Sequence, residues 1–193
     1  MKKTTLLLFA LLIAAGSSLA QERDLEKQFG VSYGIRRGEI PSAYTNPDGM
    51  VIYTFEGSNL TFDATLWNIS ERLDAGLYTT IFGCYLYPDD HDPLDFSLGA
   101  QLGIEGHFHL LSNHTSPYKR WDLKLNASVG AQYCKFLPID FSYGLSMSAI
   151  YYPHPQWGIS LETGITGFLH GRFFRSIPTE NNSILRLGVS HRF

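Results

Sequence analysis

The sequence predicts an all-β chain, an eight-stranded antiparallel transmembrane β-barrel whose strands follow one another in an up-and-down meander. Aromatic residues make up 14% and charged residues 17% of the 193 residues, with 18 glycines, a composition that suits many short strands. Apolar residues alternate with small or polar ones in several segments, which is the periodicity of a two-faced strand. After the first twenty residues, no apolar run is long enough for a transmembrane helix.

The N-terminal segment has the pattern of a secretory signal peptide. Lys2 and Lys3 precede an apolar run, Thr4–Ala15, and Ser18-Leu19-Ala20 forms a small-x-small site. We expect Sec export with cleavage near Ala20, and the alternative is an uncleaved membrane anchor. The expected organisation is a signal peptide at 1–20, a polar periplasmic lead-in at 21–28 and one barrel domain at 29–193.

The first four strands are expected at 29–36, 59–67, 73–87 and 96–110. Phe29–Arg36, Asn59–Trp67 and Phe96–Leu110 alternate clearly, whereas 73–87 has apolar residues on both parities around Ile81-Phe82, so its facing stays open. The segment 37–58 contains turn signals and is expected to be a loop. Within it, Met50–Phe55 either extends the second strand or forms a small hairpin above the membrane.

The last four strands are expected at 121–133, 141–151, 157–169 and 183–193. Trp121–Tyr133 and Phe141–Tyr151 place bulky apolar residues on one face and mostly small polar ones on the other. The interior of an eight-stranded barrel is only just wide enough for side chains, so we expect the small polar set inside and the bulky set against lipid. The alternative is a soluble lipocalin-like barrel with the two faces exchanged.

Aromatic residues gather at the strand ends, as in the two girdles that flank the lipid band of a membrane barrel. The girdle residues are expected to be Trp67, Tyr85, Trp121, Tyr133, Tyr151 and Trp157. The last strand, SILRLGVSHRF, alternates in the same way and carries an aromatic residue, Phe193, at its end.

Together with the signal peptide and the strand rhythm, this last strand resembles the small outer-membrane β-barrels of the OmpA/OmpX type. The resemblance implies a porin-like cell-envelope protein in the outer membrane of a Gram-negative bacterium, in contact with lipid and lipopolysaccharide. It also implies that the barrel assembly machinery binds the C-terminal strand and reads Phe193 as its signal.

The lumen is expected to hold a network of charged residues, since charges in a narrow interior need partners. The network residues are Arg36, Asp63, Glu105, His107, His109, Lys124, Glu162 and Arg186, with Arg192 also facing inward. The approximate hairpin register places His107 opposite Lys124 and Glu105 near Asn126. The network could simply fill the barrel, or it could form an ion-responsive gate or a narrow pore.

Glu105, His107 and His109 share one face and could chelate a metal, but no fourth ligand is evident. Neither a metal nor a cofactor is therefore expected. Asp89–Asp92 is interpreted as a solvated acidic loop. Cys84 and Cys134 fall on the third and fifth strands, roughly 9–10 Å apart, so two thiols are favoured over a disulfide.

The function is expected to be structural, or an interaction with an envelope or host-surface protein through the outer loops. The first outer loop contains Tyr44 and the segment Met50–Phe55, and the last contains Arg172–Arg175. The aromatic residues of both loops suit such contacts. A net charge of −3 gives no indication of nucleic-acid binding. The enzymatic alternative is a lipid A deacylase or acyltransferase using His170 with Ser176 and Glu180, or His191 with Ser190. No stretch resembles either catalytic motif, so no catalytic residue is assigned.

Overall fold

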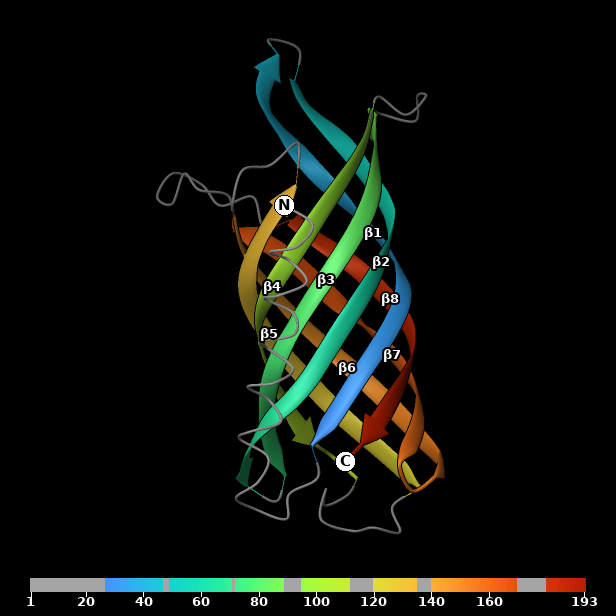
Figure 1. The fold of residues 1–193 in the computed structure, drawn as a ribbon. Coiled ribbons are helices and arrows are strands. Elements are labelled where there is room, and N and C mark those ends of the chain that lie inside the picture. The colour runs from blue at the N-terminus through green and yellow to red at the C-terminus, as the bar shows by residue number, and fades with distance from the viewer. Residues whose placement is uncertain are drawn as a thin grey trace, which may run out of the picture.

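The structure is a computed structural model that describes residues 27–46, 49–70, 72–88, 95–111, 120–134, 140–169 and 180–193. In these residues, eight strands close into one antiparallel barrel in which each strand pairs with its neighbours in the chain and β8 pairs with β1 (Figure 1). The predicted fold is confirmed. The strands are β1 (Gln28–Asn46), β2 (Gly49–Ser70), β3 (Leu73–Pro88), β4 (Asp95–His109), β5 (Trp121–Cys134), β6 (Asp140–His154), β7 (Trp157–Leu169) and β8 (Glu180–Arg192).

The two ends of the barrel differ. The start of β1 and the end of β8 meet at one end, where the backbone N–H of Phe193 donates to the carbonyl of Lys27 at 2.9 Å. We call this the terminal end; it is the lower end in Figure 1. The opposite end, called the loop end, carries the β1–β2 hairpin, which rises beyond the other strands. The expected signal peptide and most of the expected lead-in lie outside the described residues, and Gln28 already belongs to β1.

The β1–β2 hairpin corrects the expectation of a loop at 37–58. Apart from Pro47 and Asp48, which are not described, the whole segment lies in the two strands, so Met50–Phe55 extends β2. In the described residues β1 pairs with β8 only as far as Gly38. Beyond Gly38 its outer edge has no described partner strand, and this edge tolerates Pro41 and the register shift between Pro41 and Thr45.

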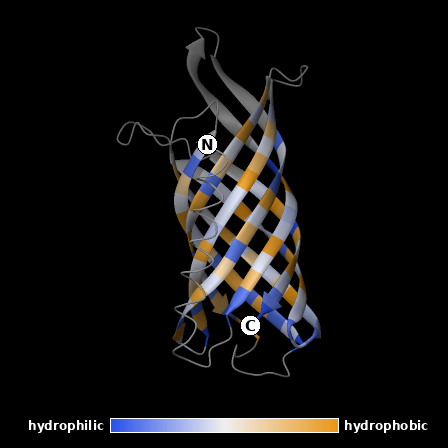
Figure 2. Ribbon diagram, viewed as in Figure 1, coloured by the Kyte–Doolittle hydropathy of each residue, from blue (hydrophilic) through white to orange (hydrophobic). Residues whose placement is uncertain are grey.

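Figure 2 shows hydrophobic and hydrophilic residues alternating along the described strands, whose successive side chains point to the outer surface and the lumen in turn. On β4, Leu98, Leu102 and Ile104 are more than half exposed on the outer surface, while Gln101 and His107 are buried inside. The ambiguous strand follows the same rule, since Tyr78 and Phe82 on β3 are buried in the lumen and Ile81 is exposed outside. No helix in the described part of the chain has the length and apolar character needed to cross a membrane.

Candidate functional site

The barrel lumen is the candidate site because the residues of the expected charge network converge there. All eight residues of the expected network occupy lumen-facing positions. Arg36, His107, His109, Lys124 and Arg186 are buried, and Asp63, Glu105 and Glu162 are half-buried around an internal cavity. Their contacts fall into three levels along the barrel axis.

At the terminal end, two histidines each lie between two carboxylates. His109 Nδ1 is 2.9 Å from Asp122 Oδ1, and His109 Nε2 is 2.8 Å from Asp74 Oδ2. The other oxygen of Asp74 lies 2.5 Å from His107 Nδ1, and His107 Nε2 is 3.5 Å from Glu105 Oε2. We call these five residues, Glu105, His107, Asp74, His109 and Asp122, the acid–imidazole row. The row links β3, β4 and β5.

Three further contacts close the same end of the lumen. Lys124 Nζ donates to Gln28 Oε1 at 3.1 Å, which joins β5 to β1 across the barrel. The Tyr152 hydroxyl donates to the same oxygen at 3.4 Å. The guanidinium of Arg192 lies over the Tyr152 ring, 3.3 Å from its centroid. These contacts join strands that are not neighbours. The side chains therefore fill the cross-section of the lumen at this end of the barrel.

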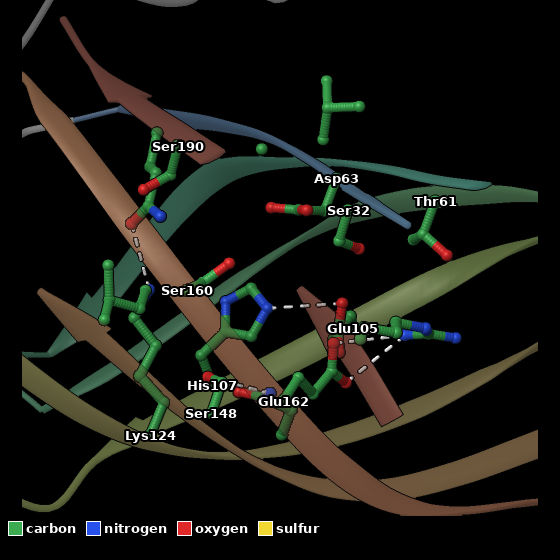
Figure 3. A pocket seen from close by; sticks show the side chains of 16 residues that line it. Ser32, Thr61, Asp63, Glu105, His107, Lys124, Ser148, Ser160, Glu162 and Ser190 are labelled. Atoms are coloured by element: carbon green, nitrogen blue, oxygen red, sulfur yellow. Dashed lines mark hydrogen bonds and ion pairs between the residues drawn. The ribbon is translucent and has the colours of Figure 1, made fainter. Parts of the chain in front are cut away.

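The central level holds a cavity of about 50 Å³, lined by polar side chains that include Asp63, Glu105, Glu162 and Arg186. Figure 3 shows Glu105, His107 and Glu162 pointing into it. Arg186 Nη1 lies 3.3 Å from both oxygens of Glu162, and Arg186 Nε donates to Asn59 Oδ1 at 3.2 Å. One buried water occupies about 10–15 Å³ of cavity volume. The cavity therefore has room for a few waters and not for an organic ligand.

At the level nearest the loop end, larger side chains fill the lumen. Arg36 Nη2 donates to Thr166 Oγ1 at 2.7 Å, and its guanidinium lies 5.1 Å from the centroid of the Phe82 ring. Gln101 Nε2 donates to the Tyr78 hydroxyl at 2.8 Å and to Ser142 Oγ at 2.9 Å. Tyr78 has space because it packs against Gly103, where a Cβ would lie 2.7 Å from its ring.

The predicted register between β4 and β5 is wrong by two residues. His107 pairs with Asn126 and His109 with Lys124, whereas the expectation placed His107 opposite Lys124. A two-residue shift keeps every side chain on its own face, so the facing of the two strands was still predicted correctly. Sequence reasoning also missed Asp74, because the facing of its strand was ambiguous, and it did not single out Asp122.

The expected girdle residues lie on the outer surface in two groups. Trp67, Trp121, Tyr151 and Trp157 occur toward the terminal end, and Tyr85 and Tyr133 toward the loop end. The Trp121 and Tyr151 rings are 4.6 Å apart, and Tyr85 packs on Phe96 at 5.0 Å. Phe193 is exposed, and its ring lies 4.7 Å from that of His191.

The structure separates one pair that had been considered for catalysis. Ser190 is buried in the lumen, whereas His191 lies on the outer surface with its ring 4.6 Å from Trp157. Successive residues on a strand point to opposite faces, so these two side chains do not meet. His170, Ser176, the acidic loop Asp89–Asp92 and Arg172–Arg175 lie outside the described residues. The side chains of Tyr44, Met50–Phe55, Cys134 and Glu180 do so as well.

In the described residues, no three His, Cys, Asp or Glu side chains are arranged to hold a metal ion. The nitrogens of His107 and His109 face carboxylate oxygens instead. The thiol of Cys84 is buried, with its sulfur 3.6 Å from the carbonyl oxygen of Ser97.

No protein-family model matches this sequence, and none of the curated proteins matches it closely. Among solved structures, the chain is similar to Neisserial surface protein A, at 12% identity and a TM-score of 0.52 over 86% of this chain and 97% of that one. It is also similar to the outer membrane protein OprG from Pseudomonas aeruginosa, at 7% identity and a TM-score of 0.53 over 86% of this chain and 95% of that one. At these identities the likeness shows the fold alone: the chain has the fold of the small eight-stranded outer-membrane barrels.

Proposed function

We propose that this protein is an integral outer-membrane barrel whose closed lumen makes it a rigid anchor for the structures at its loop end, not a pore. The observation that carries the proposal is the polar network that crosses the lumen at three levels. Lys124 to Gln28, Arg186 to Asn59, and Arg36 to Thr166 each join strands that are not neighbours in the barrel.

Placement in a membrane is supported by the outer surface. Most exposed side chains of β4, β7 and β8 at mid-height are apolar, such as Leu102, Leu161 and Leu187, each more than half exposed. Such a continuous apolar belt is unfavourable in water and suits a lipid environment flanked by aromatic residues. The terminal end would face the periplasm, because short turns lie on that side in this class of barrel.

The lumen contacts argue against a conducting pore. A water-filled channel needs a continuous polar path wider than an ion, whereas the central cavity measures about 50 Å³ and has filled levels on both sides. The expected experiment is planar-bilayer recording of the full chain, with the heat-induced gel shift as a check of folding. A folded protein without discrete conductance is expected, and regular discrete openings would refute the closed lumen.

The β1–β2 hairpin at the loop end is the part of the protein that would contact a partner. The β1–β2 hairpin continues beyond Gly38 without pairing to β8 in the described residues, so it projects a two-stranded ribbon from a rigid base. Replacing residues 41–52 by Asn-Gly would join Ile40 and Tyr53, which already pair, through a short turn. In whole-cell crosslinking, the shortened chain should insert normally and lose partner adducts that the full chain forms. Unchanged adducts would remove the interaction role.

A further inference from the structure

The acid–imidazole row runs from Asp122, which is buried near the terminal end, to the central cavity. Asp122 is the second residue of β5, next to the exposed Trp121, and His109 is the last residue of β4. At the other end, Glu105 lines the cavity beside Asp63 and Glu162. Between them, the four contacts of the row measure 2.9, 2.8, 2.5 and 3.5 Å.

The alternation of the five groups suits proton transfer. A neutral imidazole can accept a proton on one nitrogen and release one from the other. Asp74 faces His109 with Oδ2 and His107 with Oδ1, so a proton that arrives on one oxygen can leave from the other side of the same carboxyl. A proton on Asp122 can thus pass to His109, Asp74, His107 and Glu105 in turn. One proton enters the row and one leaves, and no group has to change its partners.

The pairing of acids and bases supports the same conclusion. Each ring nitrogen of the two histidines faces a carboxylate oxygen of Asp74, Asp122 or Glu105. Lys124 Nζ lies 3.9 Å from Asp122 Oδ2. The other groups that face this region are Gln28 on β1, Asp63 on β2, Tyr152 on β6 and Arg192 on β8.

The lumen on the loop side of the cavity has a different chemistry. Among the lumen-facing side chains that the structure describes on this side, none is an aspartate, glutamate or histidine; the side chains of Asp95, Asp140 and Glu180, at lumen-facing positions nearer the loop end, lie outside the described residues. Arg36, Phe82 and Ile184 are buried in this part, together with the hydrogen-bonded Tyr78, Gln101 and Ser142. A fixed guanidinium and apolar side chains oppose the passage of a proton.

We propose that the acid–imidazole row carries protons between the terminal end and the central cavity, and that the cavity has no matching path to the loop end. The cavity carboxylates therefore exchange protons with one side only. Only the identification of that side as the periplasm rests on the proposed function, since the path itself is a property of the folded barrel in any membrane mimic.

The test uses the full chain labelled with ¹⁵N-histidine in lipid nanodiscs, with exchange of the ring N–H protons followed by NMR after transfer to deuterated water. Asn replaces Asp with the same shape and still forms hydrogen bonds, but it does not relay a proton. D122N should slow exchange at both His107 and His109 by about tenfold or more. D74N should slow His107 to a similar degree and leave His109 within about twofold of the native rate.

The matched control is S148A. Ser148 lines the same cavity and accepts a hydrogen bond from Asn126 at 3.2 Å, but it is not part of the row, so both exchange rates should stay at the native value. If D74N does not fold, as judged by the gel shift, H109Q interrupts the same link and should slow His107. Exchange at His107 that is unchanged or faster in D74N or H109Q would mean that protons enter by local opening of the barrel, and would overturn the proposal.

Discussion

Glu162 and Arg186 carry opposite charges inside the lumen, and the loss of one leaves the other without its main partner. In E162Q the guanidinium loses the charge of its nearest carboxylate and keeps neutral acceptors, among them Asn59 Oδ1 at 3.2 Å. We expect a loss of about 3 kcal/mol in the free energy of unfolding, measured by urea unfolding in lipid vesicles. The double variant E162Q/R186M removes both charges, so it should be clearly more stable than the sum of the single effects predicts. Strict additivity would contradict the pairing.

Gly103 and Gly106 lie on the same strand and offer a matched comparison. A Cβ at Gly103 would lie 2.2 Å from the carbonyl oxygen of Val129 and 2.7 Å from the Tyr78 ring, whereas at Gly106 the nearest atoms are 3.9 Å away. G103A should therefore destabilise the barrel by about 1–3 kcal/mol, and G106A should be neutral or slightly stabilising. Equal unfolding midpoints for the two variants would contradict the close packing of Tyr78.

Individual lumen residues could be predicted where a strand alternates strictly. Glu105, His107 and His109 on β4 and Lys124 on β5 follow directly from period two. Asp74 could not be found in this way, because Tyr78 and Phe82 place large aromatic rings inside the lumen and remove the difference between the two faces of β3. Asp74, Tyr78 and Phe82 are separated by even numbers of residues, so they share one face of β3. Gly103 on the neighbouring strand makes room for the Tyr78 ring, and this glycine was the sequence signal that the face points into the lumen.

At the scale of the strand, β4 carries one apolar face against lipid, so the cost of a charge on that face should depend on depth. Leu102 is the central residue of β4, and Leu111 lies just beyond its terminal end. L102R should cost about 2–4 kcal/mol and L111R about 0–1 kcal/mol, measured by unfolding in vesicles. Similar costs at the two positions would mean that the outer surface of β4 does not cross a lipid layer.

Strand length and register were the least predictable features of the elements. Pro41, Pro47 and Asp48-Gly49 are turn signals, yet Pro41 lies within β1, because its edge there needs no described partner. The register of β4 against β5 depends on the connection between them, whose residues carry no strong periodicity. Closure into eight antiparallel strands was predictable, because it needs only the number of alternating segments and the short turns at the terminal end.

At the scale of the whole barrel, the lumen is closed by levels in series, and this arrangement determines how it could be opened. The Arg36–Phe82 contact blocks the loop end, and the Arg192–Tyr152 contact blocks the terminal end. Because an ion must pass both levels, R36S/F82A alone should show no discrete conductance in planar bilayers, and Y152A/R192S alone should show none either. The quadruple variant should conduct, provided that its gel shift shows a folded barrel. If R36S/F82A conducted as strongly as the quadruple variant, the terminal end would not be a barrier, and the lumen would be closed at the loop end alone.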